Sequence, residues 1–278
     1  MKPLILVTND DGVYSPGLCA AAEAVQDLGD LLIVAPRFQQ TSMGRSFPKS
    51  KDVGIIEKFK IMVNGCEIEA YGVHGSPAHA VSHGVLELAY RKPDLCISGI
   101  NYGENLGLSI SCSGTLGAAY EANSYDIPSI AISKEVDLSI QHTSDYKEMD
   151  WEVSKNTLKD IAIEVLKNGL PDRVSILNIN VPEGATINTD IRITNQARSN
   201  YSTFIKPERR DFSMSYILKS KLDVDINKID KNSDVYAIYF DKVISITPLT
   251  WDLSVNTVFD WGNRNDDRIY KYRKILPR

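Results

Sequence analysis

Short apolar runs alternate with amphipathic segments along the first part of the chain. Runs that are apolar throughout and end in turn-forming residues are typical of parallel strands buried on both faces. We predict such strands at residues 4–7, 31–34, 95–99, 127–132 and 174–179. Apolar residues at helical spacing predict helices between them, at residues 16–28, 77–90, 114–123 and 153–166. This alternation predicts an α/β protein with a parallel sheet covered by helices on both faces.

The pattern changes after Pro182. Short alternating stretches at residues 191–194 and 243–248 are separated by charged segments. Such stretches favour β-hairpins and extended arms, which would form a subdomain or an oligomerisation element. We therefore divide the chain into an α/β catalytic core, residues 1–185, and a C-terminal β-arm and tail, residues 186–278. The part after Trp251 is rich in charged residues and is expected to be surface helix or partly disordered.

Composition narrows the function classes. The chain has 278 residues, a net charge of -5, 43% hydrophobic and 24% charged residues, as in ordinary globular proteins. It lacks the basic footprint of a protein that binds a nucleic-acid polymer, but a small phosphorylated ligand stays compatible with it. The four cysteines form no C-x-x-C pair, which favours free thiols. No signal peptide or membrane-length apolar run is evident, so we expect a cytoplasmic protein without a membrane partner.

The first chemical signal is Asn9-Asp10-Asp11-Gly12, which directly follows the first apolar run. Parallel α/β sheets place their ligand sites at the carboxyl ends of the strands. Two adjacent carboxylates there repel each other, and each costs desolvation free energy unless a cation neutralises it. A solvated turn is the alternative, because Asn, Asp and Gly favour turns. We favour a divalent metal site.

Two further loops leave predicted strands at the same edge. Residues 98–107 carry Asn101 and Asn105 among several glycines. An amide oxygen beside two carboxylates makes an all-oxygen ligand set, which suits Mg²⁺ or Mn²⁺ better than zinc. Residues 35–46 could add the hydroxyl of Thr41 or Ser42, and Arg45 could face a phosphate.

A fourth loop, residues 111–117, leads into the predicted helix that begins at residue 114. Ser113, Gly114 and Thr115 place small and hydroxyl-bearing residues where a helix N-terminus offers free N–H groups to an oxyanion. Ordinary N-capping by Ser113 or Thr115 is the alternative for this loop alone. Together the loops indicate metal-assisted chemistry on a phosphate. His79 and His83 lie one helical turn apart but lack the H-E-x-x-H pattern, so we assign them no metal.

The assembled motifs resemble the SurE (survival protein E) family of metal-dependent 5′-nucleotidases. The resemblance runs in order through ILVTNDDGVYSPGL, VAP, GSPAHAV, SGINYGENLG, SGTLGAAYEA, IPSIAIS, LNINVP and SITPL. It implies a Rossmann-like three-layer α/β fold with a C-terminal β-arm exchanged between subunits in homodimers or homotetramers. It also implies hydrolysis of nucleoside monophosphates with one divalent cation, Mg²⁺ or Mn²⁺.

The resemblance also implies residue roles. Its metal ligands fall on Asp10, Asp11, Thr41 and Asn101. Its substrate-side residues fall on Asn9, Asn105, Ser113, Gly114 and Thr115. The family usually has Ser where Thr41 stands, so Ser42 is the other candidate for the hydroxyl ligand. Many members have Asp where this chain has Arg37.

The leading hypothesis is a 5′-nucleotidase, with 3′-monophosphates as further candidate substrates. A metal-activated water attacks phosphorus, and Asp10 or Asp11 orients or deprotonates it. An aspartyl-phosphate intermediate is a mechanistic variant, ranked second because phosphatases of that type typically use D-x-D. A nucleotide-sugar transferase is the hypothesis from another enzyme class. A nucleotide-sensing module whose arms bind a partner is the non-enzymatic one.

Overall fold

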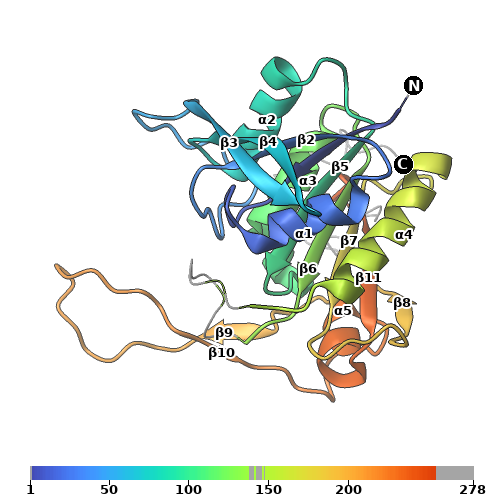
Figure 1. The fold of residues 1–278 in the computed structure, drawn as a ribbon. Coiled ribbons are helices and arrows are strands. Elements are labelled where there is room, and N and C mark those ends of the chain that lie inside the picture. The colour runs from blue at the N-terminus through green and yellow to red at the C-terminus, as the bar shows by residue number, and fades with distance from the viewer. Residues whose placement is uncertain (1, 138–140, 142–145, 147, 255–278) are drawn as a thin grey trace, which may run out of the picture.

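The computed structural model describes residues 2–137, 141, 146 and 148–254. Within these residues a nine-stranded sheet runs through the molecule in the order β3-β4-β2-β1-β5-β6-β7-β11-β8 (Figure 1). The strands from β4 to β7 in that order are parallel; they are β1 (Leu4–Thr8), β2 (Asp30–Pro36), β4 (Cys66–Val73), β5 (Leu95–Tyr102), β6 (Ser129–Lys134) and β7 (Ile176–Val181). The hairpin strand β3 (Ile56–Val63), which the sequence analysis did not predict, runs antiparallel to β4.

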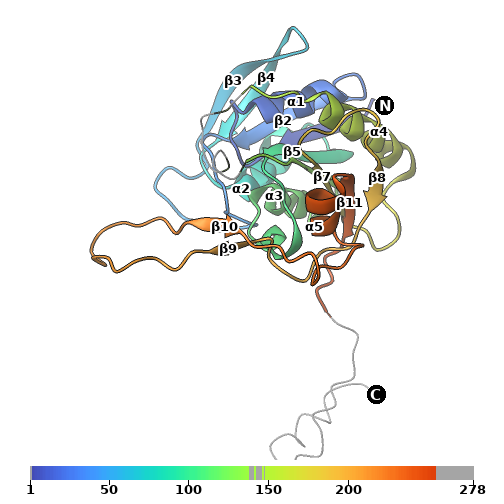
Figure 2. The ribbon, with the colours of Figure 1, turned by 90° about the horizontal axis from the view of Figure 1, so that it is seen from below.

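Helices cover both faces of the sheet. One face carries α1 (Pro16–Val25) and α4 (Glu152–Asn168), and the other carries α2 (Pro77–His83) and α3 (Gly114–Asn123). Figure 2 shows the sheet edge-on between these two pairs. The predicted α/β class is therefore confirmed, although α1 ends earlier than expected and a π-helical turn (Gly84–Leu88) follows α2. In the described part of the chain no helix is long and apolar enough to cross a membrane.

The apolar runs form strands because both faces of the sheet are covered. Successive side chains of a strand point to opposite faces. In β1, Ile5 and Val7 pack against α1 and α4, whereas Leu4 and Leu6 pack against α2 and α3. Each fully buried side chain of this kind contributes about 1.5–3 kcal/mol. A shift of β1 by one residue would exchange the two sets, so burial fixes the register and the position of the residues that follow Thr8.

The strands β1, β2 and β5 end at one edge of the sheet. The loop after β1 holds the two aspartates, the loop after β2 holds Thr41, and β5 itself extends to Tyr102. Its pairing with β6 changes register between Ser98 and Asn101. A short 3-10 helix (Gly107–Ser111) then leads into α3, whose N-terminus faces the same edge.

The C-terminal part of the chain forms two kinds of structure. The sequence predicted hairpins and arms throughout residues 190–250, but β8 (Ile191–Ile193) and β11 (Ile244–Leu249) extend the central sheet beyond β7. They do so because the side chains of Ile244 and Ile246 are buried in the core. The strands β9 (Ser202–Phe204) and β10 (Ser220–Leu222) form an antiparallel arm that projects from the body (Figures 1 and 2).

A short helix and a π-helical turn connect the arm to β11. They are α5 (Asp234–Tyr236) and residues Ala237–Asp241. The division of the chain at residue 185 stays a prediction, and the predicted charged tail lies outside the described residues from position 255 onward.

Candidate active site

Asp10 and Asp11 lie at the tip of β1, and each is only 4% exposed. Burial raises the pKa of Asp10, and burial together with the charge of Asp10 raises the pKa of Asp11. No ion pair formed by the described residues includes either aspartate. The fold therefore holds two carboxyl groups together without a protein cation, an arrangement that costs stability unless another cation neutralises it.

Asp10 packs directly on the first turn of α3. The hydroxyl of Thr115 donates a hydrogen bond of 2.7 Å to Oδ1 of Asp10. A Cβ atom at Gly114 would lie 2.6 Å from Oδ2 of Asp10, so only glycine allows this approach. The backbone N–H groups of Gly114 and Thr115 also bond the Asp10 carboxylate, so the positive end of the α3 dipole faces Asp10.

Asp11 is held from the other side, by β5 and by the loop after β2. Its Oδ2 accepts a 3.2 Å hydrogen bond from the backbone N–H of Tyr102, and its Oδ1 accepts a longer one, 3.4 Å, from Nε2 of Gln39. The hydroxyl of Tyr146 donates to the backbone oxygen of Asp11 at 2.6 Å. These contacts fix the Asp11 carboxylate but supply no positive charge.

A cavity of about 180 Å³ brings most of the predicted residues together. The sequence-predicted residues that line it are Asp10, Thr41, Ser42, Asn101, Asn105 and Ser113. Both hydroxyl candidates, Thr41 and Ser42, lie in this lining, so the choice between them stays open. Asp11, Gly114 and Thr115 are not among the lining residues, although Gly114 and Thr115 lie directly against Asp10.

Asn101 and Asn105 are held by hydrogen bonds. Nδ2 of Asn101 donates to the backbone oxygen of Gly103 at 2.6 Å, which leaves the amide oxygen of Asn101 as its available ligand atom. The side chain of Asn180 makes two hydrogen bonds to the backbone of Asn105. Its Oδ1 accepts from the N–H at 2.8 Å, and its Nδ2 donates to the C=O at 3.2 Å. Nδ2 of Asn105 donates to the hydroxyl of Ser133 at 2.9 Å.

The side chains of Asn9 and Ser113 also stabilise the local backbone. Both ends of the Asn9 amide bond the backbone of Gly12 at 3.1 Å, and Asn9 is not among the residues that line the cavity. Its position therefore shapes the turn that carries the aspartates. Ser113 caps α3, since its Oγ accepts from the N–H of Leu116 at 3.2 Å, and it lines the cavity as well.

The donor set fits a hard divalent cation. The cavity lining offers a carboxylate of Asp10, a hydroxyl from Thr41 or Ser42, and the amide oxygen of Asn101. Asp11 adds a second buried carboxylate next to Asp10 in the chain. Within the described residues no group of three or more His, Cys, Asp or Glu side chains gathers as a metal cluster. Few protein carboxylates and no sulfur or imidazole suit Mg²⁺ or Mn²⁺, which retain several water ligands, better than zinc.

The sequence analysis missed part of the cavity wall. Glu104 is 3% exposed, burial raises its pKa, and its carboxylate accepts hydrogen bonds from the hydroxyl of Tyr239 and from Nε2 of Gln141. The arm supplies four more lining residues that were not predicted, namely Tyr201, Ser202, Phe204 and Ser220. Glu104 stood inside a loop already singled out, but no local pattern connects the distant arm to this edge.

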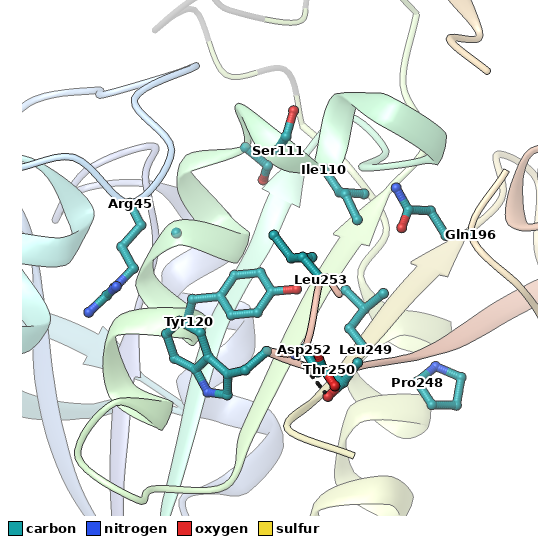
Figure 3. Close-up of a pocket in the computed structure, with 13 residues that line it drawn as sticks. Arg45, Ile110, Ser111, Tyr120, Gln196, Pro248, Leu249, Thr250, Asp252 and Leu253 are labelled. Atoms are coloured by element: carbon teal, nitrogen blue, oxygen red, sulfur yellow. Dashed lines mark hydrogen bonds between the residues drawn. The ribbon is translucent and has the colours of Figure 1, made fainter. Parts of the chain in front are cut away.

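A second cavity, of about 480 Å³, lies along α3 and shares only Ser113 with the first among the described lining residues. Arg45 and Tyr120 lie on one side of it, and Gln196 and Leu249 lie on the other (Figure 3). The guanidinium of Arg45 is 5.0 Å from the ring centre of Trp251, and its Nε donates to Glu121 at 2.8 Å. Arg45, named above as a residue that could face a phosphate, is not among the described residues that line the cavity with Asp10.

The described histidines are engaged elsewhere. The Nδ1 of His79 accepts from the N–H of Ser76 at 3.2 Å and completes a capping box for α2. His74 lies 2.6 Å from Glu57, and His83 lies 2.6 Å from Glu87. None of these three lines the cavity with Asp10. His142 lies outside the described residues.

These features define an α/β protein with a buried carboxylate pair, an oxygen-rich cavity and a helix N-terminus at one sheet edge. The sequence profile described as Survival protein SurE matches residues 5–203. A relative from Methanosarcina acetivorans named 5′-nucleotidase SurE is 39% identical over 267 residues, 93% of this chain and 96% of the relative. The chain therefore belongs to the survival protein SurE family.

Two further comparisons agree. A relative from Thermococcus gammatolerans with the same name is 38% identical over 258 residues, 92% of this chain and 93% of the relative. The crystal structure of the SurE protein from Aquifex aeolicus matches with a TM-score of 0.72 and 28% identity. That match covers 99% of this chain and 98% of the other, so the similarity extends well beyond the site.

Proposed function

We propose that this protein is a metal-dependent 5′-nucleotidase that hydrolyses nucleoside 5′-monophosphates to nucleoside and phosphate, with 3′-monophosphates as further candidate substrates. The relatives' names support the 5′-nucleotidase class. The observation that carries the metal dependence is the buried, unpaired Asp10–Asp11 pair beside the N-terminus of α3. A bound cation would relieve the repulsion between the two carboxylates, and the positive end of the helix dipole favours a bound phosphate.

One divalent cation, Mg²⁺ or Mn²⁺, would be held by Asp10, Asp11, Asn101 and the hydroxyl of Thr41 or Ser42. When bound it would neutralise the pair, polarise the phosphoryl group and make water more acidic. The hydroxyl of Ser113 and the positive end of the α3 dipole, at Gly114 and Thr115, would stabilise the non-bridging oxygens of the phosphate. Asn105, fixed by Asn180 and Ser133, would bind the phosphate from the side of β5.

The aspartates would also act as the general base for the attacking water. Asp10 or Asp11 would orient the water and accept its proton as the O–P bond forms. The nucleoside oxygen leaves as its bond to phosphorus breaks, and it takes up a proton from water to give the nucleoside hydroxyl. An aspartyl-phosphate intermediate is the second mechanism, and a single turnover in oxygen-18 water distinguishes the two. Label in an aspartate carboxylate would show the covalent route, and label in phosphate alone would show direct attack.

The test of this function is a phosphate-release panel. It compares nucleoside 5′- and 3′-monophosphates with Mg²⁺, Mn²⁺ or EDTA, and it includes Asp10→Asn. We expect release from 5′-monophosphates that depends on the metal and is lost in EDTA and in the variant. Activity that survives both would contradict the metal mechanism. Tight nucleotide binding without any release would instead favour a nucleotide-sensing module.

We also propose a homodimer or homotetramer in the cytoplasm. Exposed apolar side chains on the arm support assembly, because Phe212 is 87% exposed and Ile217 is 89% exposed. Burying such residues against a second copy is favourable. Sedimentation of the full chain measures the assembly, and a monomer at micromolar concentration would contradict it.

A further inference from the structure

The arm forms one wall of the cavity that contains Asp10. Ser202 and Phe204 of β9 line this cavity, as does Ser220 of β10, which pairs directly with Phe204. Side chains on a strand alternate, and cross-strand partners share a face. Thr203 accordingly points to the other face, where its hydroxyl bonds Asp223 at 3.1 Å. One face of the arm is thus directed at the catalytic cavity.

The base of this arm is anchored to the cavity floor. Tyr201 is 6% exposed, and its hydroxyl donates to the backbone oxygen of Glu104 at 3.1 Å. Its ring lies 5.7 Å from that of Tyr239, and its backbone oxygen accepts from the N–H of Asp223 at 3.0 Å. These contacts hold the start of β9 in place, so the position of Phe204 relative to Asp10 follows from them.

Phe204 contributes a largely exposed aromatic ring to the lining of the cavity. It is 71% exposed, and among the described residues it makes no ring contact with another aromatic side chain. Leaving an aromatic ring exposed forgoes the free energy of burying it. The rest of the lining is mostly polar and surrounds the carboxylate of Asp10. A nucleotide has an aromatic base at one end and a phosphate at the other. This cavity offers an exposed aromatic ring for the base and the Asp10 site for the phosphate.

We infer that Phe204 stacks on the nucleobase of the substrate while the phosphate lies beside Asp10, so that the arm provides the base-binding subsite. This inference rests on the proposed function. Every nucleobase has a π-face, so stacking tolerates all bases and discriminates against phosphate esters that lack an aromatic ring. Ser202 and Ser220 flank the ring and provide hydroxyl groups for polar edges of the nucleoside.

The larger second cavity is less suited to the base. Both aromatic rings of this cavity already have partners. The ring centres of Tyr120 and Trp251 lie 5.0 Å apart, and the guanidinium of Arg45 lies over the ring of Trp251. It also joins the Asp10 cavity only through Ser113 among the described lining residues. Phe204, in contrast, shares one continuous cavity with Asp10.

The kinetic test compares Phe204→Ala and Phe204→Trp with the control Tyr90→Ala, an exposed aromatic residue outside the cavity lining. The substrates are adenosine 5′-monophosphate and ribose 5-phosphate, which lacks the base. We expect Phe204→Ala to raise KM for the nucleotide roughly 5- to 150-fold, the range of base stacking, and Phe204→Trp to restore it. The effect on ribose 5-phosphate is expected to stay below about threefold, since it has no base to stack.

A binding test does not depend on turnover. In Phe204→Trp the indole fluorescence should be quenched by adenosine and unchanged by inorganic phosphate, whereas Tyr90→Trp should respond to neither. No quenching in Phe204→Trp, or equal KM changes for both substrates in Phe204→Ala, would overturn the inference. So would a larger nucleotide KM in Tyr120→Ala than in Phe204→Ala. Wild-type protein that releases no phosphate from any nucleotide would refute the proposed function, and the fluorescence titration would then still decide the role of Phe204.

Discussion

The hydroxyl of Thr115 donates a 2.7 Å hydrogen bond to Oδ1 of Asp10 and so joins the first turn of α3 to the tip of β1. Thr115 is fully buried, and Asp10 has no protein cation among its described partners. The bond orients one oxygen of Asp10 and leaves the other, Oδ2, beside Gly114. The sequence motifs of two loops more than one hundred residues apart thus form one unit of the site.

Replacement of Thr115 by Val removes this hydrogen bond while it keeps the shape of the side chain. A hydrogen bond to a charged group contributes about 1.5–3 kcal/mol, so kcat/KM for phosphate release should fall roughly 10- to 100-fold. Thr115→Ser retains the hydroxyl and serves as the control. Equal activities of the Val and Ser variants would show that the bond does not orient Asp10 for the reaction.

Gly114→Ala tests the close approach of α3 to Asp10. The added Cβ would lie 2.6 Å from Oδ2 and 2.7 Å from Cβ of Asp10, so the carboxylate must move. A displacement of this size should lower kcat on the order of 100-fold. Gly65→Ala is the control: it has no neighbouring atom within 4 Å and a φ of +78°, so it should cost about 1 kcal/mol of stability without loss of activity. A fully active Gly114→Ala would contradict the site geometry.

The pH dependence of stability in EDTA tests the charge of the pair. Both aspartates have a pKa raised above the ordinary value of 3.8, so the folded state holds their protons to higher pH than the unfolded state does. The metal-free protein should therefore lose stability as the pH rises above about 4, until both groups are ionised in the folded state.

Asp11→Asn removes one of these charges. In EDTA at pH 8 the variant should melt several degrees above the wild type, because about 1 kcal/mol corresponds to about 2–4 °C in a chain of this size. With saturating Mg²⁺ the wild type should gain stability and the variant should not, since binding to the folded state stabilises it. A variant that melts below the wild type in EDTA would show that the pair is not electrostatically strained.

Asn180 should act on catalysis through Asn105. Asn180→Ala leaves the buried N–H of Asn105 without its acceptor, which costs about 1–3 kcal/mol of stability and loosens the loop. We expect a lower melting temperature and a lower kcat. In an Asn105→Ala background the same change should have little further effect on kcat, because contacting residues of one network are not additive. Fully additive losses in kcat would assign Asn180 a separate role.

Much of the fold was predictable from local patterns. The β1 run that begins at Leu4 is apolar at every position because both sheet faces are covered, and helices with caps at Ser76 and Ser113 begin where their residues predict. The β3–β4 hairpin was missed although Lys60 and Glu67 pair across it at 2.8 Å. Its exposed face is charged, so it lacks the continuous apolar run that identified the parallel strands.

The site was predictable where its residues follow strands or begin a helix, as Ser113 does. The carboxyl ends of β1, β2 and β5 must meet at one edge, which is why Asp10, Thr41 and Asn101 line one cavity. Phe204 reaches the same cavity through the path of the arm, which no local spacing determines. That Arg45 could face a phosphate stays a prediction, and its guanidinium lies near Trp251, a residue distant in sequence.

The central claim is that Asp10 and Asp11 hold a divalent cation in this fold. Titration of Mn²⁺ into the metal-free protein, followed by electron paramagnetic resonance of the free ion, measures this directly. We expect one Mn²⁺ bound per chain in the wild type, and binding weakened at least about 100-fold in Asp10→Asn and Asp11→Asn while Tyr90→Ala binds normally. Unchanged Mn²⁺ affinity and stoichiometry in both aspartate variants would contradict it.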